Sequence, residues 1–114
     1  MLLGLQGGES VVTSFAEAAE VVRSTVIRKY PQINRAFIFG SFAEGMQGSG
    51  SDLDVLVELS SPMGLAFIAL IQDIEKAAGI SVDVLTIKQA KDLEEKYNYE
   101  IIKNARVVYD RAEN

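Results

Sequence analysis

A Gly-Ser pair and the acidic pair that follows it constrain this chain more than any other feature of its sequence. The apolar run Phe37-Ile38-Phe39 is bounded by Gly40-Ser41, which is typical of a buried strand that ends in a tight turn. Beyond a short loop, Asp52-Leu53-Asp54 leads into a segment rich in β-branched residues, which predicts a second strand. Because side chains alternate along a strand, Asp52 and Asp54 are expected on one face, about 6.6 Å apart.

These carboxylates favour a metal-dependent reaction on a nucleotide. Two carboxylates held side by side repel each other unless a cation lies between them. Mg²⁺ is commonly held by one or two carboxylates together with substrate phosphates. Taken alone, Gly40-Ser41 could be a simple strand-to-helix turn. In the same way, Asp52 could be a solvent-exposed residue at the start of a strand. Asp54 is harder to explain in that way, because aspartate is depleted in strands and this one has apolar neighbours.

The segment from Phe39 to Val57 resembles the signature of the DNA-polymerase-β-like nucleotidyltransferase superfamily: a hydrophobic strand, a Gly-Ser turn, a spacer and an acidic-x-acidic strand. The similarity is closest to the minimal nucleotidyltransferases (MNT), which are single small domains, and it covers most of the chain. Members carry a third carboxylate on a later strand, for which Asp83 is the candidate. Glu44 is a departure, because many relatives carry a basic residue there and a carboxylate would repel a triphosphate.

The resemblance implies an enzyme that transfers AMP from ATP to an acceptor hydroxyl with the help of two Mg²⁺ ions. By resemblance, Asp52 and Asp54 bind both ions, and Asp83 holds the catalytic ion and helps to deprotonate the acceptor. Gly40 and Ser41 would hold the β and γ phosphates, which leave as pyrophosphate. Positioning and electrostatic stabilisation are sufficient for such a transfer, so it needs no histidine.

The resemblance also implies a partner. Minimal nucleotidyltransferases are commonly the antitoxin of a toxin–antitoxin pair, and they adenylylate a tyrosine of a helical HEPN toxin, so we expect a HEPN-like partner protein. Two alternatives stay open: a non-catalytic antitoxin that neutralises its partner by contact, and a nucleotidyltransferase with a small-molecule acceptor. Tyr97 and Tyr99 are either core and rim aromatics or part of a partner-binding surface. The base preference and homo-oligomerisation are also open.

Composition excludes several other kinds of site. The chain of 114 residues has no cysteine and no histidine, which excludes disulfides, thiolate metal sites and histidine-based catalysis. Its net charge is −5 and its 11 basic residues are scattered, so direct binding of nucleic acid is not expected. No apolar run approaches the length of a membrane span, and a basic signal-peptide start is missing. We therefore expect no membrane association and a cytoplasmic location.

Hydrophobic periodicity and turn residues predict one domain over residues 10–114 after a flexible segment, 1–9. The expected helices are one capped by Ser10 and ending near Lys29, a short one at Phe42–Glu44, one starting at Ser60 to Pro62 and ending before Gly79, and one over Gln89–Asn104. The expected strands are Arg35–Phe39, Asp54–Glu58, Ile80–Ile87 and Arg106–Tyr109, with a mobile loop at Gly45–Ser51.

The chemistry of the motif predicts part of the topology. Ser41 follows the first strand, whereas Asp52 and Asp54 lie at the start of the second, so these two strands should be antiparallel if the residues share one ligand. The second and third strands are separated by a helix, which favours a parallel crossover. We therefore predict the α+β class: a small mixed sheet with helices mainly on one face, in a polymerase-β-like nucleotidyltransferase fold.

Overall fold

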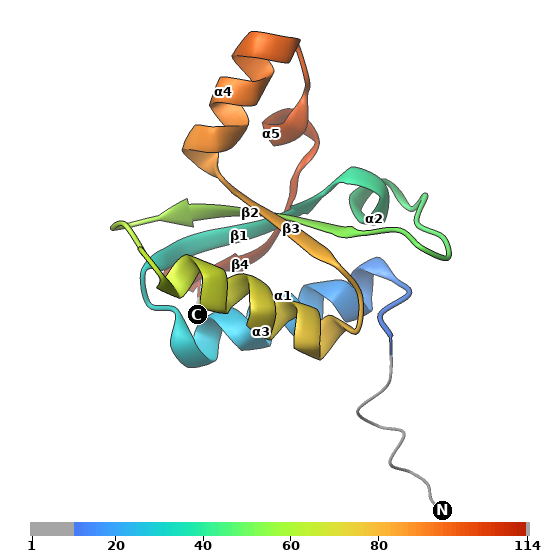
Figure 1. Ribbon diagram of the computed structural model, residues 1–114, viewed down its shortest axis with the longest axis horizontal. Coiled ribbons are helices and arrows are strands. Elements are labelled where there is room, and N and C mark those ends of the chain that lie inside the picture. Colours follow the sequence, from blue (N-terminus) through green and yellow to red (C-terminus); the bar gives the residue numbers. More distant parts are fainter. Residues whose placement is uncertain (1–10, 114) are drawn as a thin grey trace, which may run out of the picture.

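The computed structural model describes residues 11–113, which form a four-stranded sheet with flanking helices (Figure 1). The predicted flexible segment, 1–9, lies outside these residues. Within them, no helix is both long and apolar enough to cross a membrane. In chain order the elements are α1 (Phe15–Lys29), β1 (Ile33–Phe39), α2 (Gly40–Glu44), β2 (Leu53–Leu59), α3 (Ala66–Ala78), β3 (Val82–Thr86), α4 (Ile87–Tyr97), α5 (Ile101–Asn104), β4 (Arg106–Asp110) and the 3₁₀ turn η2 (Arg111–Glu113).

The sheet is mixed, and its strand order is β3-β2-β1-β4. β1 pairs antiparallel with both β2 and β4, whereas β2 pairs parallel with β3. The helix α3 lies between the two parallel strands in the chain and makes their crossover connection. The predicted class and the predicted directions of the first three strands are confirmed.

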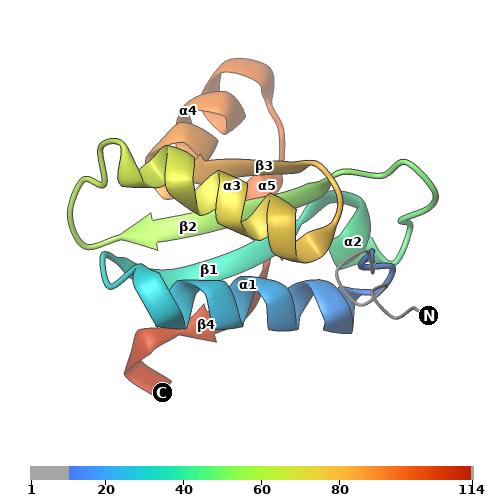
Figure 2. The same ribbon diagram turned by 60° about the horizontal axis from the view of Figure 1, so that its bottom comes forward.

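The two faces of the sheet are covered unequally (Figures 1 and 2). Helices α1 and α3 pack on one face, and α4 lies against the other. The larger core lies under α1 and α3, where the fully buried side chains include Val22, Ile33, Ile38, Leu53, Leu70 and Ile74. On the opposite face, Leu56 of β2 and Ala90 of α4 are buried. Since each buried aliphatic side chain contributes about 1.5–3 kcal/mol, most apolar stabilisation comes from the α1–α3 side.

Helix α1 begins later than its sequence predicts. The predicted cap, Ser10, lies outside the described residues, and residues 11–13 are not helical. The Ser14 hydroxyl caps the helix by accepting a 3.1 Å hydrogen bond from the Glu17 N–H. The Val12 N–H donates a 3.0 Å hydrogen bond to the Ala78 carbonyl at the end of α3. This tertiary contact holds Val12 in a non-helical backbone.

The helix predicted to start at Ser60 to Pro62 begins only at Ala66. Ser60 donates to the Gln32 carbonyl from its N–H at 2.7 Å and from its hydroxyl at 3.1 Å, so its side chain does not act as a cap. Gly64 has a φ of 56°, in the left-handed region, which interrupts a right-handed helix. The predicted start was therefore wrong by about one turn.

The single helix predicted over Gln89–Asn104 is two helices, α4 and α5. α4 begins earlier than predicted, because Thr86 and Gln89 form a reciprocal capping box with hydrogen bonds of 3.1 and 2.9 Å. It ends at Tyr97 because Asn98 has a φ of 60°, a conformation that asparagine tolerates better than most residues. The break turns the chain back toward the sheet before β4.

Candidate active site

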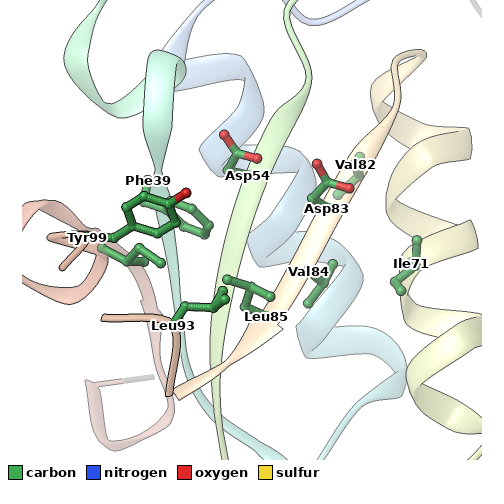
Figure 3. A pocket seen from close by; sticks show the side chains of 10 residues that line it. Phe39, Asp54, Ile71, Val82, Asp83, Val84, Leu85, Leu93 and Tyr99 are labelled. Atoms are coloured by element: carbon green, nitrogen blue, oxygen red, sulfur yellow. The ribbon is translucent and has the colours of Figure 1, made fainter. Parts of the chain in front are cut away.

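The register of the sheet brings two of the three predicted aspartates side by side. Asp54 of β2 pairs with Phe39 at the end of β1 on one side and with Asp83 of β3 on the other. Residues in register on neighbouring strands project to the same face, and Figure 3 shows the two carboxylates next to each other. Gly40 follows Phe39 directly, so the Gly-Ser turn lies beside Asp54.

Gly40 lets this turn approach Asp54 closely. Its φ of 71° is in the left-handed region, which glycine adopts without strain. A Cβ atom added at Gly40 would overlap Oδ2 of Asp54, so any side chain there would displace the carboxylate. Gly45, at the other end of α2, has the same φ of 71° but open space where a Cβ would lie. The glycine requirement at position 40 is therefore both conformational and steric.

Helix α2, which starts with the turn, is held in place from distant parts of the chain. Its Phe42 and Ala43 side chains are buried. Arg106 of β4 donates a 3.3 Å hydrogen bond from Nη1 to the Ala43 carbonyl, and its guanidinium carbon lies 3.7 Å from the centre of the Phe15 ring. Sequence reasoning did not identify Arg106, because a single basic residue at the start of a strand carries no pattern that predicts such a contact.

Asp54 lies in an environment that opposes its ionisation. Burial raises the pKa of its carboxyl group, and the negative charges of Asp83 and then Asp52 raise this pKa further, to about 6. The Asp54 side chain is partly buried, whereas Asp52, just before β2, and Asp83 are exposed. The three carboxylates are thus close enough to influence one another. A bound cation would relieve their repulsion.

This donor set fits a divalent cation that also binds phosphate. Within residues 11–113, no group of three or more acidic side chains converges closely enough to form a metal site by itself. Mg²⁺, however, is commonly bound by only one or two carboxylates, with substrate phosphates and water completing its shell. The in-register pair of Asp54 and Asp83 meets that requirement, and the charge of Asp83 adds to the effect of burial in raising the pKa of Asp54.

A cavity of about 520 Å³ opens beside these two carboxylates (Figure 3). Besides Asp54 and Asp83, its walls include Phe39 and Leu85 of the sheet, Leu93 of α4, and Tyr99 and Ile101 beyond α4. Apolar walls with a few polar groups are typical of small-molecule sites. Sequence reasoning did not predict this cavity, because its walls come from segments that only the fold brings together.

The loop between the turn and β2 is tied to the rest of the protein. The Gln47 side-chain amide donates a 3.0 Å hydrogen bond to the Thr13 carbonyl. Gly48 and Ser51 are linked by two bonds, of 2.9 Å to the Ser51 hydroxyl and 3.0 Å to the Gly48 carbonyl. Ser41 is partly exposed in the first turn of α2, and Glu44 is exposed at its end. The mobility expected of this loop stays a prediction.

Comparisons with known proteins show which family this chain is similar to. Residues 24–114 match the family described as "Polymerase beta, Nucleotidyltransferase". A relative from Methanocaldococcus jannaschii, named "Putative protein adenylyltransferase MJ1379", is 30% identical over 80 residues, which cover 66% of this chain and 80% of the relative.

Two solved structures share the fold. A toxin–antitoxin crystal structure with AMP-PNP has a TM-score of 0.66 and 18% identity, and covers 81% of this chain and 73% of that chain. The complex of a tri-AMPylated Shewanella oneidensis HEPN toxin with MNT antitoxin has a TM-score of 0.63 and 14% identity, and covers 87% of this chain and 75% of that chain. At such identities the likeness concerns the fold alone. The family match over most of the sequence establishes that this chain belongs to the polymerase β nucleotidyltransferase family.

Proposed function

We propose that this nucleotidyltransferase transfers AMP from ATP to a hydroxyl group of a partner protein. The observation that carries the proposal is the alignment of Asp54 and Asp83 on neighbouring strands beside the Gly40-Ser41 turn. Two ligands for a divalent cation and a turn suited to phosphates then belong to one site, as phosphoryl transfer requires. The relative named as a protein adenylyltransferase supports a protein as the acceptor.

Asp54 and Asp83, together with Asp52, are the residues that would hold two Mg²⁺ ions. Bound there, the ions would neutralise the negative charge that develops on the phosphates. The first N–H groups of α2 and the Ser41 hydroxyl would hold the β and γ phosphates, because N–H groups in the first turn of a helix have no acceptor within the helix. Gly40 would leave room for those phosphates.

In the transfer step, the acceptor oxygen attacks the α-phosphorus of ATP. The bond from this phosphorus to the oxygen that bridges to the β phosphate breaks, and pyrophosphate leaves. The acceptor proton passes to a nearby carboxylate, for which Asp83 is the candidate. Its exposed position on the cavity wall supports this role, since a general base must come within hydrogen-bonding reach of the proton that it takes.

The partner we propose is a HEPN toxin with a tyrosine as the acceptor, which makes this chain the antitoxin. Two structures with a similar fold come from toxin–antitoxin complexes, and in one of them the HEPN toxin is AMPylated. The apolar cavity beside Asp83 supports an aromatic acceptor, because its walls can pack against a tyrosine ring. The use of ATP is consistent with a cytoplasmic reaction.

The test uses ATP that is labelled with ³²P at either the α or the γ phosphate. The chain is mixed with this ATP, Mg²⁺ and a candidate HEPN-family partner protein, with EDTA in a control sample. AMP transfer predicts that the partner takes up label from the α position only, and only with Mg²⁺. Label from the γ position, or no protein labelling despite ATP binding, would contradict the proposal.

The same experiment separates the two alternatives. A partner that is bound and neutralised but never labelled would identify a non-catalytic antitoxin. Release of pyrophosphate together with an α-labelled small product would identify a small-molecule acceptor. Chromatography of the nucleotide fraction distinguishes these outcomes.

A further inference from the structure

The four tyrosines of the chain have different surroundings. Tyr30 is buried, and its hydroxyl donates a 2.5 Å hydrogen bond to Asp73. Tyr109 is also buried, in β4. Tyr97 and Tyr99 are exposed, at 56% and 57%, and their rings stack with centroids 5.7 Å apart. Of the four, only Tyr99 lines the cavity that also contains Asp54 and Asp83.

The Tyr99 hydroxyl is available for chemistry. In Figure 3 the hydroxyl end of the ring is directed toward the strands that carry Asp54 and Asp83. This hydroxyl makes no hydrogen bond to another part of residues 11–113, in contrast to that of Tyr30. A nucleophile that shares a cavity with the carboxylates of a transfer site, and that is free of other partners, can serve as an acceptor.

The segment that carries Tyr99 is fixed on both sides. The Asn98 N–H donates a 2.9 Å hydrogen bond to the Glu94 carbonyl. On the other side, the Glu94 carboxylate accepts a 2.8 Å hydrogen bond from the Ile102 N–H, which ties α5 back to α4. Stacking on Tyr97 orients the Tyr99 ring further. The segment therefore presents Tyr99 to the cavity in a defined position.

We propose that Tyr99 is itself an AMP acceptor, so that the chain modifies its own cavity wall. This proposal rests on the proposed transfer of AMP from ATP. The Tyr99 Oη attacks the α-phosphorus, the bond to the bridging oxygen breaks, and pyrophosphate leaves. The hydroxyl proton passes to a neighbouring carboxylate and then to solvent, and the product is an AMP group joined to Oη by a phosphodiester bond. The modification occurs in cis, because the hydroxyl and the carboxylates belong to one cavity of the same molecule.

The test incubates the full chain with ATP and Mg²⁺, both alone and with the HEPN-family partner, and maps AMP by peptide mass spectrometry. We expect AMP on Tyr99 in the wild-type chain and in Tyr97→Phe, and none on the chain in Tyr99→Phe. Tyr97→Phe is the matched control, because Tyr97 is equally exposed and stacked on Tyr99 but does not line the cavity. The fraction of chain labelled per unit time should not change with protein concentration.

The possible outcomes separate this inference from the proposed function. AMP on the partner, with none on Tyr99 under either condition, would overturn the inference and leave the function standing. AMP on Tyr97 or another residue instead of Tyr99, or labelling that accelerates with protein concentration, would overturn it as well. If neither the chain nor the partner is labelled, the proposed function fails and the inference fails with it.

Discussion

Replacing Gly40 by alanine is expected to lower both stability and activity, and the chain contains a matched control. At a φ of 71°, alanine costs roughly 1–2 kcal/mol of unfolding free energy. Gly45→Ala has the same φ and an unobstructed Cβ, so it incurs this cost alone. At Gly40 the new Cβ also overlaps Oδ2 of Asp54, and moving that side chain off its rotamer adds about 0.5–1.5 kcal/mol.

Urea unfolding in EDTA measures these stability changes, and AMP transfer measures the displacement of Asp54. Gly40→Ala should slow transfer by on the order of 10²-fold, because a displacement of about 1 Å in a catalytic group can cost that much. In an Asp54→Ala background, Gly40→Ala should cost no more stability than Gly45→Ala. The remaining Asp54 Cβ lies 3.4 Å from the added atom, which is an ordinary contact. Double-mutant analysis would isolate this coupling.

Equal loss of stability in Gly40→Ala and Gly45→Ala, together with full transfer activity in both, would refute the reasoning. It would mean that the Asp54 carboxylate does not lie against the turn. The requirement for glycine at position 40 would then be conformational only.

Three further variants test separate parts of the structure. Asp54 titrates near 3.8 when unfolded and at about 6 when folded, so stability should fall as pH rises between these values and stay low above pH 6. Asp54→Asn in EDTA should remove this fall and raise the unfolding free energy at pH 8 by about 1–2 kcal/mol. The full pKa shift of Asp54 corresponds to roughly 3 kcal/mol, which is reduced here because the side chain is partly exposed. Urea unfolding over a series of pH values measures this effect, and an unchanged dependence of stability on pH would contradict the prediction. Tyr30→Phe removes the hydrogen bond to Asp73 and should cost about 1–2 kcal/mol in the same assay, with ATP affinity unchanged because Asp73 lies on α3, away from the site. Arg106→Leu leaves the Ala43 carbonyl without its donor and should lower both stability, by about 1–2 kcal/mol, and transfer rate; unaltered transfer would show that Arg106 does not position α2.

The strand directions around the site could be predicted because the Gly-Ser turn and the aspartates must lie at the same end of the sheet to share one ligand. Residues at the end of one strand and the start of the next can share a ligand only if the strands are antiparallel, and β1 and β2 are. The crossover through α3 then makes β3 parallel to β2, which aligns Asp83 with Asp54. The positions of these residues in the chain were sufficient to predict both strand directions.

Helix boundaries were less predictable because tertiary hydrogen bonds decide them. Ser60 is a typical helix cap in the sequence, but its N–H and its hydroxyl both donate hydrogen bonds to the Gln32 carbonyl. Val12 has the periodicity of a helix, but its N–H is committed to the Ala78 carbonyl. The helix breaks at Asn98 because this residue has a left-handed backbone conformation. The apolar periodicity continues across the break and therefore predicts a single helix.

The walls of the site were not predictable from local patterns. The cavity combines Phe39, Leu93 and Tyr99, which lie on separate elements and carry no shared motif. Arg106 supports α2 from the far end of the chain. The acidic and Gly-Ser motifs therefore indicated a candidate site in the sequence, whereas the cavity beside it is formed by residues that only the fold brings together. The roles assigned to Asp52, Asp54, Asp83, Gly40 and Ser41 remain predictions.

In the proposed function, Asp54 and its neighbouring aspartates support transfer of AMP with Mg²⁺. The most direct test is the rate at which label from α-³²P-labelled ATP appears on the partner protein, compared between wild type and Asp54→Asn. Asparagine keeps the size of the side chain and removes a charged ligand. We predict that transfer is lost while the folded structure and its unfolding cooperativity are kept. Near wild-type transfer by Asp54→Asn would contradict the role proposed for Asp54.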